Sequence, residues 1–343
     1  MSQRLTVNSN GTNTNTIMRL TLQIVALGVT VALALDNDNP RRRRKALSLT
    51  WIIDKPPTFS YNDDDAYNPG NWQNINVKDR ARWLTVPADY KNRCNQLAVE
   101  SPINLETARA EHCQSYRETE FYTPNDSSCT IDDLRFDVTP FGLRSILYSS
   151  CERPNISLPT DTETGPWEFR GVELKLRSEH RVDGRQFDGE LILSHTRGDD
   201  ALFLSIMLEA TSFRHEDHME AFIARWEQTL AGDSVVCQTP LEYDVLSNKE
   251  YPTGSPFPYD MIPSPSFFQY EGTLTVPPCT PGVTRVVHLK PMQISRRQFN
   301  RLSTVMSGHV YPDSCEVGNS LSKHGENARP LQSPDFAQVM LCQ

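Results

Sequence analysis

Alternating apolar and polar positions predict several β-strands between residues 145 and 289. In residues 171–177, the apolar Val172, Leu174 and Leu176 are separated by charged residues, so one face of the strand is apolar. Similar strand-like runs occupy residues 145–148, 190–195, 201–208 and 283–289. These runs do not alternate with helices as βαβ units would, which favours one mixed or antiparallel β domain.

Two segments have helical periodicity instead. In residues 215–231 apolar side chains recur every three or four positions, and Gly232 follows as the expected end of the helix. A second helix is predicted to begin at Ser295, whose hydroxyl can cap the first turn while Gln298 reaches back to it. The pattern therefore predicts a mostly β fold with surface helices.

The N-terminal residues are predicted to contain a targeting segment. Residues 1–17 are polar and are expected to be a disordered leader, whereas 18–35 contain an apolar run that ends in a small-x-small pattern at residues 32–34. The sixteen apolar-run residues 20–35, at about 1.5 Å each, fall short of a bilayer core of about 30 Å. We expect a cleaved signal peptide, with an uncleaved membrane anchor as the alternative.

A cluster of five basic residues at 41–45 follows within a predicted linker or propeptide, residues 36–55. It fits a propeptide processing site, and it equally fits the cytoplasmic flank of an anchor. The sequence leaves both open, and a membrane is expected as a partner only if residues 20–35 are retained.

Composition narrows the class of protein. The 343 residues are 38% hydrophobic and 22% charged, which excludes both a disordered chain and a protein with many membrane spans. The net charge is -9, and residues 1–50 carry seven basic and two acidic side chains, so the remaining chain carries -14. This acidic body argues against nucleic acid as a partner.

Eight cysteines fit an oxidising compartment, and their even number permits complete pairing. Glycosylation sequons begin at Asn125 and Asn155, which adds support for secretion. The sequence predicts a secreted or lumenal protein, anchored to a membrane only in the alternative above.

Three stretches carry a resemblance to a known family. They are Ser-Pro-Ile-Asn-Leu at 101–105, Ser-Glu-His-Arg-Val-Asp-Gly at 178–184 with the strand at 189–195, and Tyr-Glu-Gly-Thr-Leu-Thr-Val-Pro-Pro-Cys at 270–279. Together they resemble the α-class carbonic anhydrases. The resemblance implies a large, twisted, mainly antiparallel sheet with a central conical cleft over residues 56–311. Residues 312–343 are then a C-terminal extension, which Cys315 and Cys342 are expected to tether.

The resemblance also implies a zinc ion held by three histidines, which this chain lacks. The corresponding positions are Glu173, Lys175 and Ile192, and no histidine lies between residues 112 and 180. A lysine ammonium opposes a dication and an isoleucine has no lone pair. We expect no metal here, and we expect Glu173 and Lys175 to form a salt bridge in its place.

Residues that support the zinc site in the family are largely retained. Glu179 and Thr275 match a relay that orients the zinc-bound hydroxide, which makes them vestigial here. Further matches are the buried network His180, Glu190, His195 and Tyr270 and the disulfide Cys94–Cys279. The cleft wall has changed: Leu274 keeps the family's character, whereas Ser194, Val276 and Arg285 stand where the resemblance implies a valine, a threonine and a tryptophan. The resemblance also implies cis peptide bonds before Pro102 and Pro278.

Weaker signals leave other chemistry open. The histidines of residues 215–218 lie one helical turn apart, which fits either a metal site or a solvated first turn. Lys175 with a lowered pKa would be a nucleophile, although pairing with an acid is the simpler interpretation. Lys175 and Arg285 together fit a small anionic ligand.

The sequence therefore predicts a secreted or lumenal carbonic anhydrase-like protein without CO2 hydration activity. It would act as a binding or structural module, with no cofactor and with an unidentified protein or a small anion as its partner. The alternative is an active carbonic anhydrase that holds zinc through unusual ligands.

Overall fold

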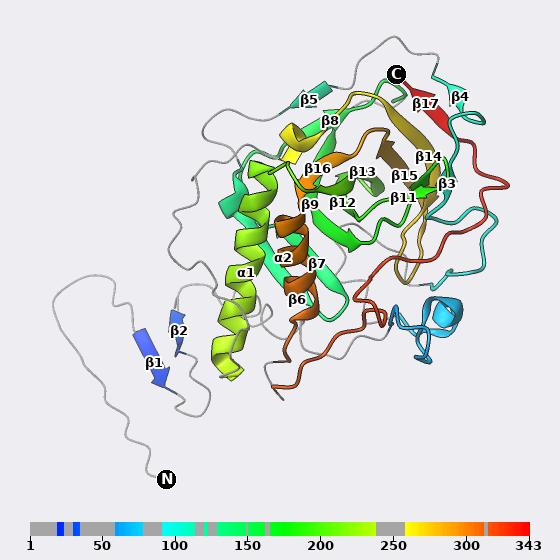
Figure 1. Cartoon of the computed structure of the whole chain (residues 1–343). Helices are drawn as coiled ribbons and strands as arrows, with labels where there is room; N and C mark the ends of the chain where they lie inside the picture. Colours follow the sequence, from blue (N-terminus) through cyan, green and yellow to red (C-terminus); the bar gives the residue numbers. More distant parts are fainter. Residues whose placement is uncertain are drawn as a thin grey trace, which may run out of the picture. The chain divides into compact units, whose positions relative to one another are not determined.

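The computed structural model describes residues 19–23, 30–34, 59–77, 91–113, 120–122, 129–148, 150–161, 165–237, 258–311 and 315–343 (Figure 1). The chain forms two compact units, Met1–Ile53 and Asp54–Gln343. In the first unit, β1 (Arg19–Gln23) pairs antiparallel with β2 (Thr30–Ala34). The predicted leader, the basic cluster and the sequon at Asn125 lie outside the described residues. Within the described part, no helix is long and apolar enough to cross a membrane.

The second unit is built on one large mixed sheet, which twelve strands form within the described ranges. Its main path is β4 (Glu111–His112), β17 (Met340–Cys342), β14 (Phe267–Thr273), β15 (Pro281–His288), β13 (Asp200–Thr211), β12 (Gly189–Arg197), β9 (Trp167–Leu176), β7 (Gly142–Leu147) and β6 (Leu134–Thr139). Off this path, β16 (Met292–Ser295) pairs with β13, while β8 (Asn155–Ser157) pairs with β9 and with β5 (Glu120–Tyr122). A separate small sheet contains β3 (Asn104–Leu105), β10 (Arg181–Val182) and β11 (Arg185–Gln186).

Most strand pairs are antiparallel, as predicted, but β13 pairs in parallel with both β15 and β16. Each of the five predicted strand segments overlaps a strand of this sheet, namely β7, β9, β12, β13 or β15. The apolar alternation identified these strands because their two faces meet different surroundings.

The register places the functional positions side by side on one face of the sheet. Arg144 on β7 is opposite Glu173 on β9, and Glu173 is opposite Ile192 on β12. Ile192 is in turn opposite Ser205 on β13. Because side chains alternate along each strand, the residues between them, such as Leu174 on β9, point to the other face.

Helices cover that other face. Figure 1 shows α1 (Asp217–Cys237) and α2 (Arg296–Ser307) side by side. Apolar side chains of both helices, including Trp226 and Leu302, share one buried cluster with Leu174. Short 3-10 helices are η1 (Pro69–Asn74), η3 (Ile131–Asp133) and η4 (Pro258–Met261). The main core thus lies between the helices and the sheet, opposite the face that carries the functional positions.

The predicted helix boundaries are right at one helix and wrong at the other. Ser295 caps α2, accepting from the Gln298 amide, and Gln298 accepts from the Ser295 amide, so the predicted capping box is present. The prediction that Gly232 ends α1 is wrong, because the helix continues to Cys237. Gly232 does not adopt the positive φ of a C-terminal glycine cap, so it is an interior helical residue that costs about 1 kcal/mol relative to alanine.

Disulfides tie distant segments to the sheet. The pair that the resemblance implies, Cys94–Cys279, is present, together with Cys113–Cys342 and Cys129–Cys151. Cys315 is also disulfide-bonded. The peptide bonds before Pro102 and Pro278 are cis, as the resemblance implies. The C-terminal segment is therefore covalently joined to the body of the domain and adds β17 to the main sheet.

Candidate functional site

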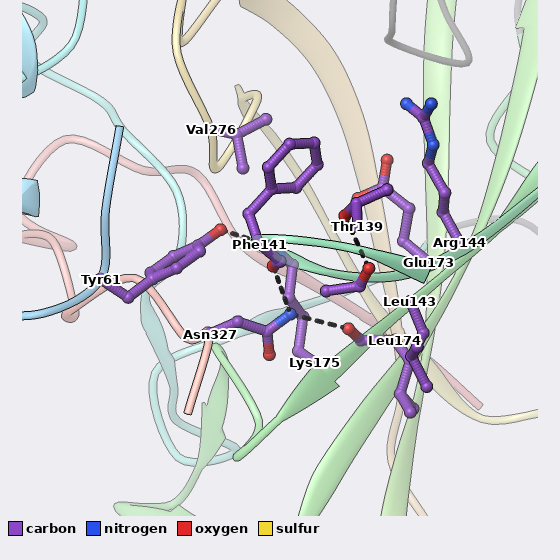
Figure 2. A pocket seen from close by; sticks show the side chains of 11 residues that line it. Tyr61, Thr139, Phe141, Leu143, Arg144, Glu173, Leu174, Lys175, Val276 and Asn327 are labelled. Carbon is purple, nitrogen blue, oxygen red and sulfur yellow. Dashed lines mark hydrogen bonds between the residues drawn. The ribbon is translucent and has the colours of Figure 1, made fainter. Parts of the chain in front are cut away.

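Lys175 lies at the centre of the candidate site. It projects from β9 and its side chain is only 3% exposed. The Nζ atom lies 3.1 Å from the Tyr61 hydroxyl, with which it forms a hydrogen bond (Figure 2). It also lies 3.3 Å from Glu179 Oε1, with which it forms an ion pair. Tyr61 comes from the segment before η1, and Glu179 comes from the turn after β9. Two distant parts of the sequence thus meet at one ammonium group.

These partners keep Lys175 charged. Burial alone would lower the pKa of Lys175, but the Glu179 carboxylate and the Tyr61 oxygen outweigh it and raise that pKa above its ordinary value. Burial also raises the pKa of Tyr61 to about 12, so the phenol keeps its proton near neutral pH. A nucleophilic Lys175 needs a lowered pKa, and the site produces the opposite shift.

Glu179 is bound to Lys175 instead of taking part in a relay. Its Oε1 atom also accepts a hydrogen bond from the backbone amide of Arg329, at 3.1 Å. Its Oε2 atom is buried and has no partner. Among the described residues, no hydrogen bond joins Glu179 to Thr275. Oε1, the only Glu179 carboxylate oxygen with partners, faces the lysine and the C-terminal segment.

The expected salt bridge between Glu173 and Lys175 is not formed, and that prediction is wrong. The carboxylate within 4.0 Å of Lys175 belongs to Glu179, not to Glu173. Glu173 is opposite Arg144 and attracts both cations, which helps to raise the pKa of Lys175, whereas burial still leaves the pKa of Arg144 below its ordinary value. Arg144 has its own carboxylate, Asp137, at 3.0 Å. Lys175 pairs instead with Glu179, a more deeply buried acid four residues further along the chain. The alternation of apolar and polar residues on the strand does not predict this pairing.

A buried hydrogen-bond network lies beside this group. Glu190 Oε2 accepts from the backbone amides of Glu179 and His180, and Glu190 Oε1 lies 2.8 Å from His180 Nδ1. His180 Nε2 is 2.8 Å from the Tyr270 hydroxyl, which donates to Ser101. These contacts hold the turn that carries Glu179.

His195 lies apart from that network. Its Nε2 atom is 2.8 Å from the Tyr259 hydroxyl, and the two rings are stacked. Burial lowers the pKa of His195 to about 3, so the ring is neutral near pH 7. The structure therefore joins three of the four predicted network residues and places the fourth with a tyrosine on η4.

Of the four predicted cleft-wall residues, two belong to apolar clusters and two are buried polar residues. Leu274 packs with Ile192 and Phe203, whereas Val276 packs with Tyr61 and the aromatic residues near η1. The other two wall residues are polar and buried: Ser194 donates to the carbonyl of Gly171, and Arg285 donates to the carbonyl of Thr273.

Comparison with known proteins places this chain in a family. Residues 78–342 match the model of the eukaryotic-type carbonic anhydrases. The chain belongs to the eukaryotic-type carbonic anhydrase family. This match includes most of residues 312–343, which the sequence alone presented as an extension.

Relatives and solved structures agree with this membership. The human carbonic anhydrase-related protein is 30% identical over 243 residues, covering 68% of this chain and 79% of the relative. Dioscorin dioA3 of Dioscorea japonica is 22% identical, covering 85% of this chain and 88% of the relative.

Among structures, dioscorin complexed with ascorbate has a TM-score of 0.57 at 21% identity, covering 83% of this chain and 98% of that one. The α-carbonic anhydrase of Thermovibrio ammonificans with sulfanilamide has a TM-score of 0.55 at 18% identity, covering 82% and 98%. These likenesses show the carbonic anhydrase fold.

In this carbonic anhydrase family member, the residues that the resemblance assigns to the zinc position do not fit zinc. Lys175 directs a charged ammonium into the site, and Ile192 is packed in an apolar cluster. Only Glu173 offers a ligand atom, whereas zinc sites use at least three protein ligands. Within the described ranges, no three His, Cys, Asp or Glu side chains come close enough to hold a metal ion.

A small pocket remains beside Lys175, with about 290 Å³ of empty space including its open mouth. Figure 2 shows Glu173, Lys175 and Tyr61 around it, together with Phe141 and Asn327. Asn327 donates to the carbonyls of Leu174 and Phe141 and accepts from the amide of Leu176. The C-terminal segment thus forms part of the site.

The sequence did not indicate that Asn327, Arg329 and Arg144 contribute to this site. Asn327 and Arg329 belong to a segment without hydrophobic periodicity, and their contacts depend on a chain reversal that no local pattern encodes. Arg144 precedes a predicted strand, and only its register against β9 places it beside Glu173.

Two surface predictions have separate outcomes. His215 and His218 pair with neighbouring acids, Asp217 and Glu216, which fits the solvated first turn. Asn155 is half-buried on β8, which has a paired strand on each side. Its glycosylation stays a prediction.

Proposed function

We propose that this protein is a carbonic anhydrase-like member of the secretory pathway that does not hydrate CO2 and acts as a binding or structural module. One observation supports the proposal most strongly. The Lys175 ammonium is paired with Glu179 at the position where the chain's resemblance to the family implies a zinc ion. A fixed positive charge there repels a dication.

The chemistry of hydration supports the same conclusion. At neutral pH the reaction needs a hydroxide, and a zinc ion supplies it by lowering the pKa of its bound water to about 7. Lys175 is an ammonium and has no basic lone pair to take a proton from water. Glu179 is the counter-ion of Lys175 and is not free to orient a hydroxide.

The secretory location rests on two independent supports. The sequence predicts a signal peptide at residues 18–35. Three disulfides have both cysteines among the described residues, and such bonds persist in oxidising compartments.

Metal analysis and stopped-flow CO2 hydration test the proposal on the purified protein after incubation with zinc. We expect no stoichiometric zinc and a hydration rate equal to the buffer control. Stoichiometric zinc together with turnover that a sulfonamide inhibits would establish the alternative, a carbonic anhydrase with unusual ligands.

A restoration variant tests the alignment. Glu173→His/Lys175→His/Ile192→His supplies the three imidazoles at the register positions of β9 and β12, and we expect it to bind one zinc. The exposed Lys290→His is the control, because it adds a histidine away from the site and should bind none. Equal zinc content in the two variants would contradict the assigned positions.

A further inference from the structure

Arg285 is a buried cation on β15, next to Tyr270 of β14 and Phe203 of β13. Its side chain is 1% exposed. The Nε and Nη2 atoms donate to the carbonyl of Thr273, with Nε at 3.1 Å. The guanidinium lies over the Phe203 ring, with Cζ 4.7 Å from the ring centroid. One side of the guanidinium is therefore held by a carbonyl and one face by a ring.

Unlike the buried cations Lys175, Arg144 and Arg329, Arg285 has no carboxylate partner among the described residues. Lys175 pairs with Glu179, Arg144 with Asp137, and Arg329 with Glu100. In the part of the chain that the structure describes, no carboxylate lies within 4.0 Å of Arg285. Its Nη1 atom, which is buried, donates to no acceptor.

An arginine cannot relieve this by losing its proton, because the guanidinium stays charged in proteins. Burying an unpaired charge is unfavourable, and a single carbonyl with an aromatic face offsets only part of that cost. A ligand that brings a negative charge to Nη1 would remove both the missing hydrogen bond and the missing counter-charge.

We propose that Arg285 Nη1 binds a small, weakly hydrated monovalent anion. The size follows from burial: the guanidinium lies over Phe203, which packs with Ile192, Leu274 and Val283, all at most 4% exposed, and Arg285 itself is 1% exposed, so a large organic acid does not fit. An apolar environment also selects anions that lose water at little cost, such as bromide or nitrate, over strongly hydrated ones such as fluoride. The site goes beyond the proposed function, because it does not depend on whether the protein hydrates CO2.

Bromide is the probe. Urea unfolding of the whole protein is measured at constant ionic strength while bromide replaces fluoride. Once bromide exceeds its Kd, each tenfold rise should lower the unfolding equilibrium constant of the wild-type protein about tenfold. Arg285→Met should lose this response, whereas Arg297→Met, which removes an exposed arginine of α2, should keep it.

Anomalous diffraction from wild-type crystals in bromide gives a second readout that needs no variant. A bromide peak within hydrogen-bond distance of Nη1 is expected. No peak at Nη1, or an equal bromide response in wild type and Arg285→Met, would overturn the proposal. Should Arg285→Met fail to fold, the peak alone decides.

Discussion

The ion pair between Lys175 and Glu179 provides the sharpest stability prediction. In Lys175→Met the ammonium is replaced by an uncharged side chain of similar length, and the carboxylate of Glu179 stays buried. One backbone amide, from Arg329, remains as its hydrogen-bond donor. Breaking a buried pair from one side costs about 3–5 kcal/mol, so we expect the free energy of unfolding to fall by that amount.

Removing both charges should restore most of that loss. In Lys175→Met/Glu179→Gln no buried charge is left unpaired, and replacing whole buried pairs is often neutral or stabilising. We expect the double variant to lie within about 1–2 kcal/mol of the wild type. The single and double variants thus separate the cost of an orphaned carboxylate from the cost of altered packing.

Urea unfolding with intact disulfides, followed by tryptophan fluorescence, measures these differences at pH 7. The exposed Lys290→Met is the matched control and should change stability by less than about 0.5 kcal/mol. The reasoning is refuted if Lys175→Met costs less than about 1 kcal/mol, or if the double variant is as unstable as the sum of its two single variants.

Acid and disulfide perturbations give three further tests. Burial would raise the pKa of Glu190, but His180 and the backbone amides hold it at about 2, below the unfolded value near 4.5. The stability this provides is complete above pH 4.5 and is lost as the pH falls toward 2, so urea titrations of Glu190→Gln should show a flatter slope there than wild type. Burial lowers the pKa of His195 to about 3, so the unfolded chain takes up a proton below about pH 6.5 and the native one does not. Stability should fall between pH 6.5 and 3, less steeply in His195→Gln, and equal slopes in the two proteins would contradict this. Cys94→Ser/Cys279→Ser opens a loop closed over 185 residues and should cost about 2–5 kcal/mol in urea unfolding, whereas a loss below 1 kcal/mol would show that the bond constrains little.

The sequence predicted the elements whose determinants are local. Alternation on β9 identified both faces of that strand, and the capping box at Ser295 located the start of α2. The extension of α1 beyond Gly232 was missed because a glycine ends a helix only when its backbone leaves the helical region, which the residue type does not fix.

Sequence reasoning selected residues of the candidate site but did not predict most of their contacts. The resemblance identified Lys175 and Glu179, but their pairing depends on side-chain reach and burial, which the alternation of a strand does not specify. The contacts of Asn327 and Arg329 with the site depend on how the C-terminal segment folds back against β9. Such long-range contacts leave no periodic trace in a single sequence.

The central claim is that a protonated lysine, and not a metal ion, occupies the middle of this carbonic anhydrase fold. Anomalous diffraction at the zinc edge, from wild-type crystals grown with zinc, tests it most directly. We predict no zinc peak among residues 173, 175 and 192, and electron density for the Lys175 Nζ beside Glu179. A zinc ion coordinated there, with the lysine displaced, would contradict the account.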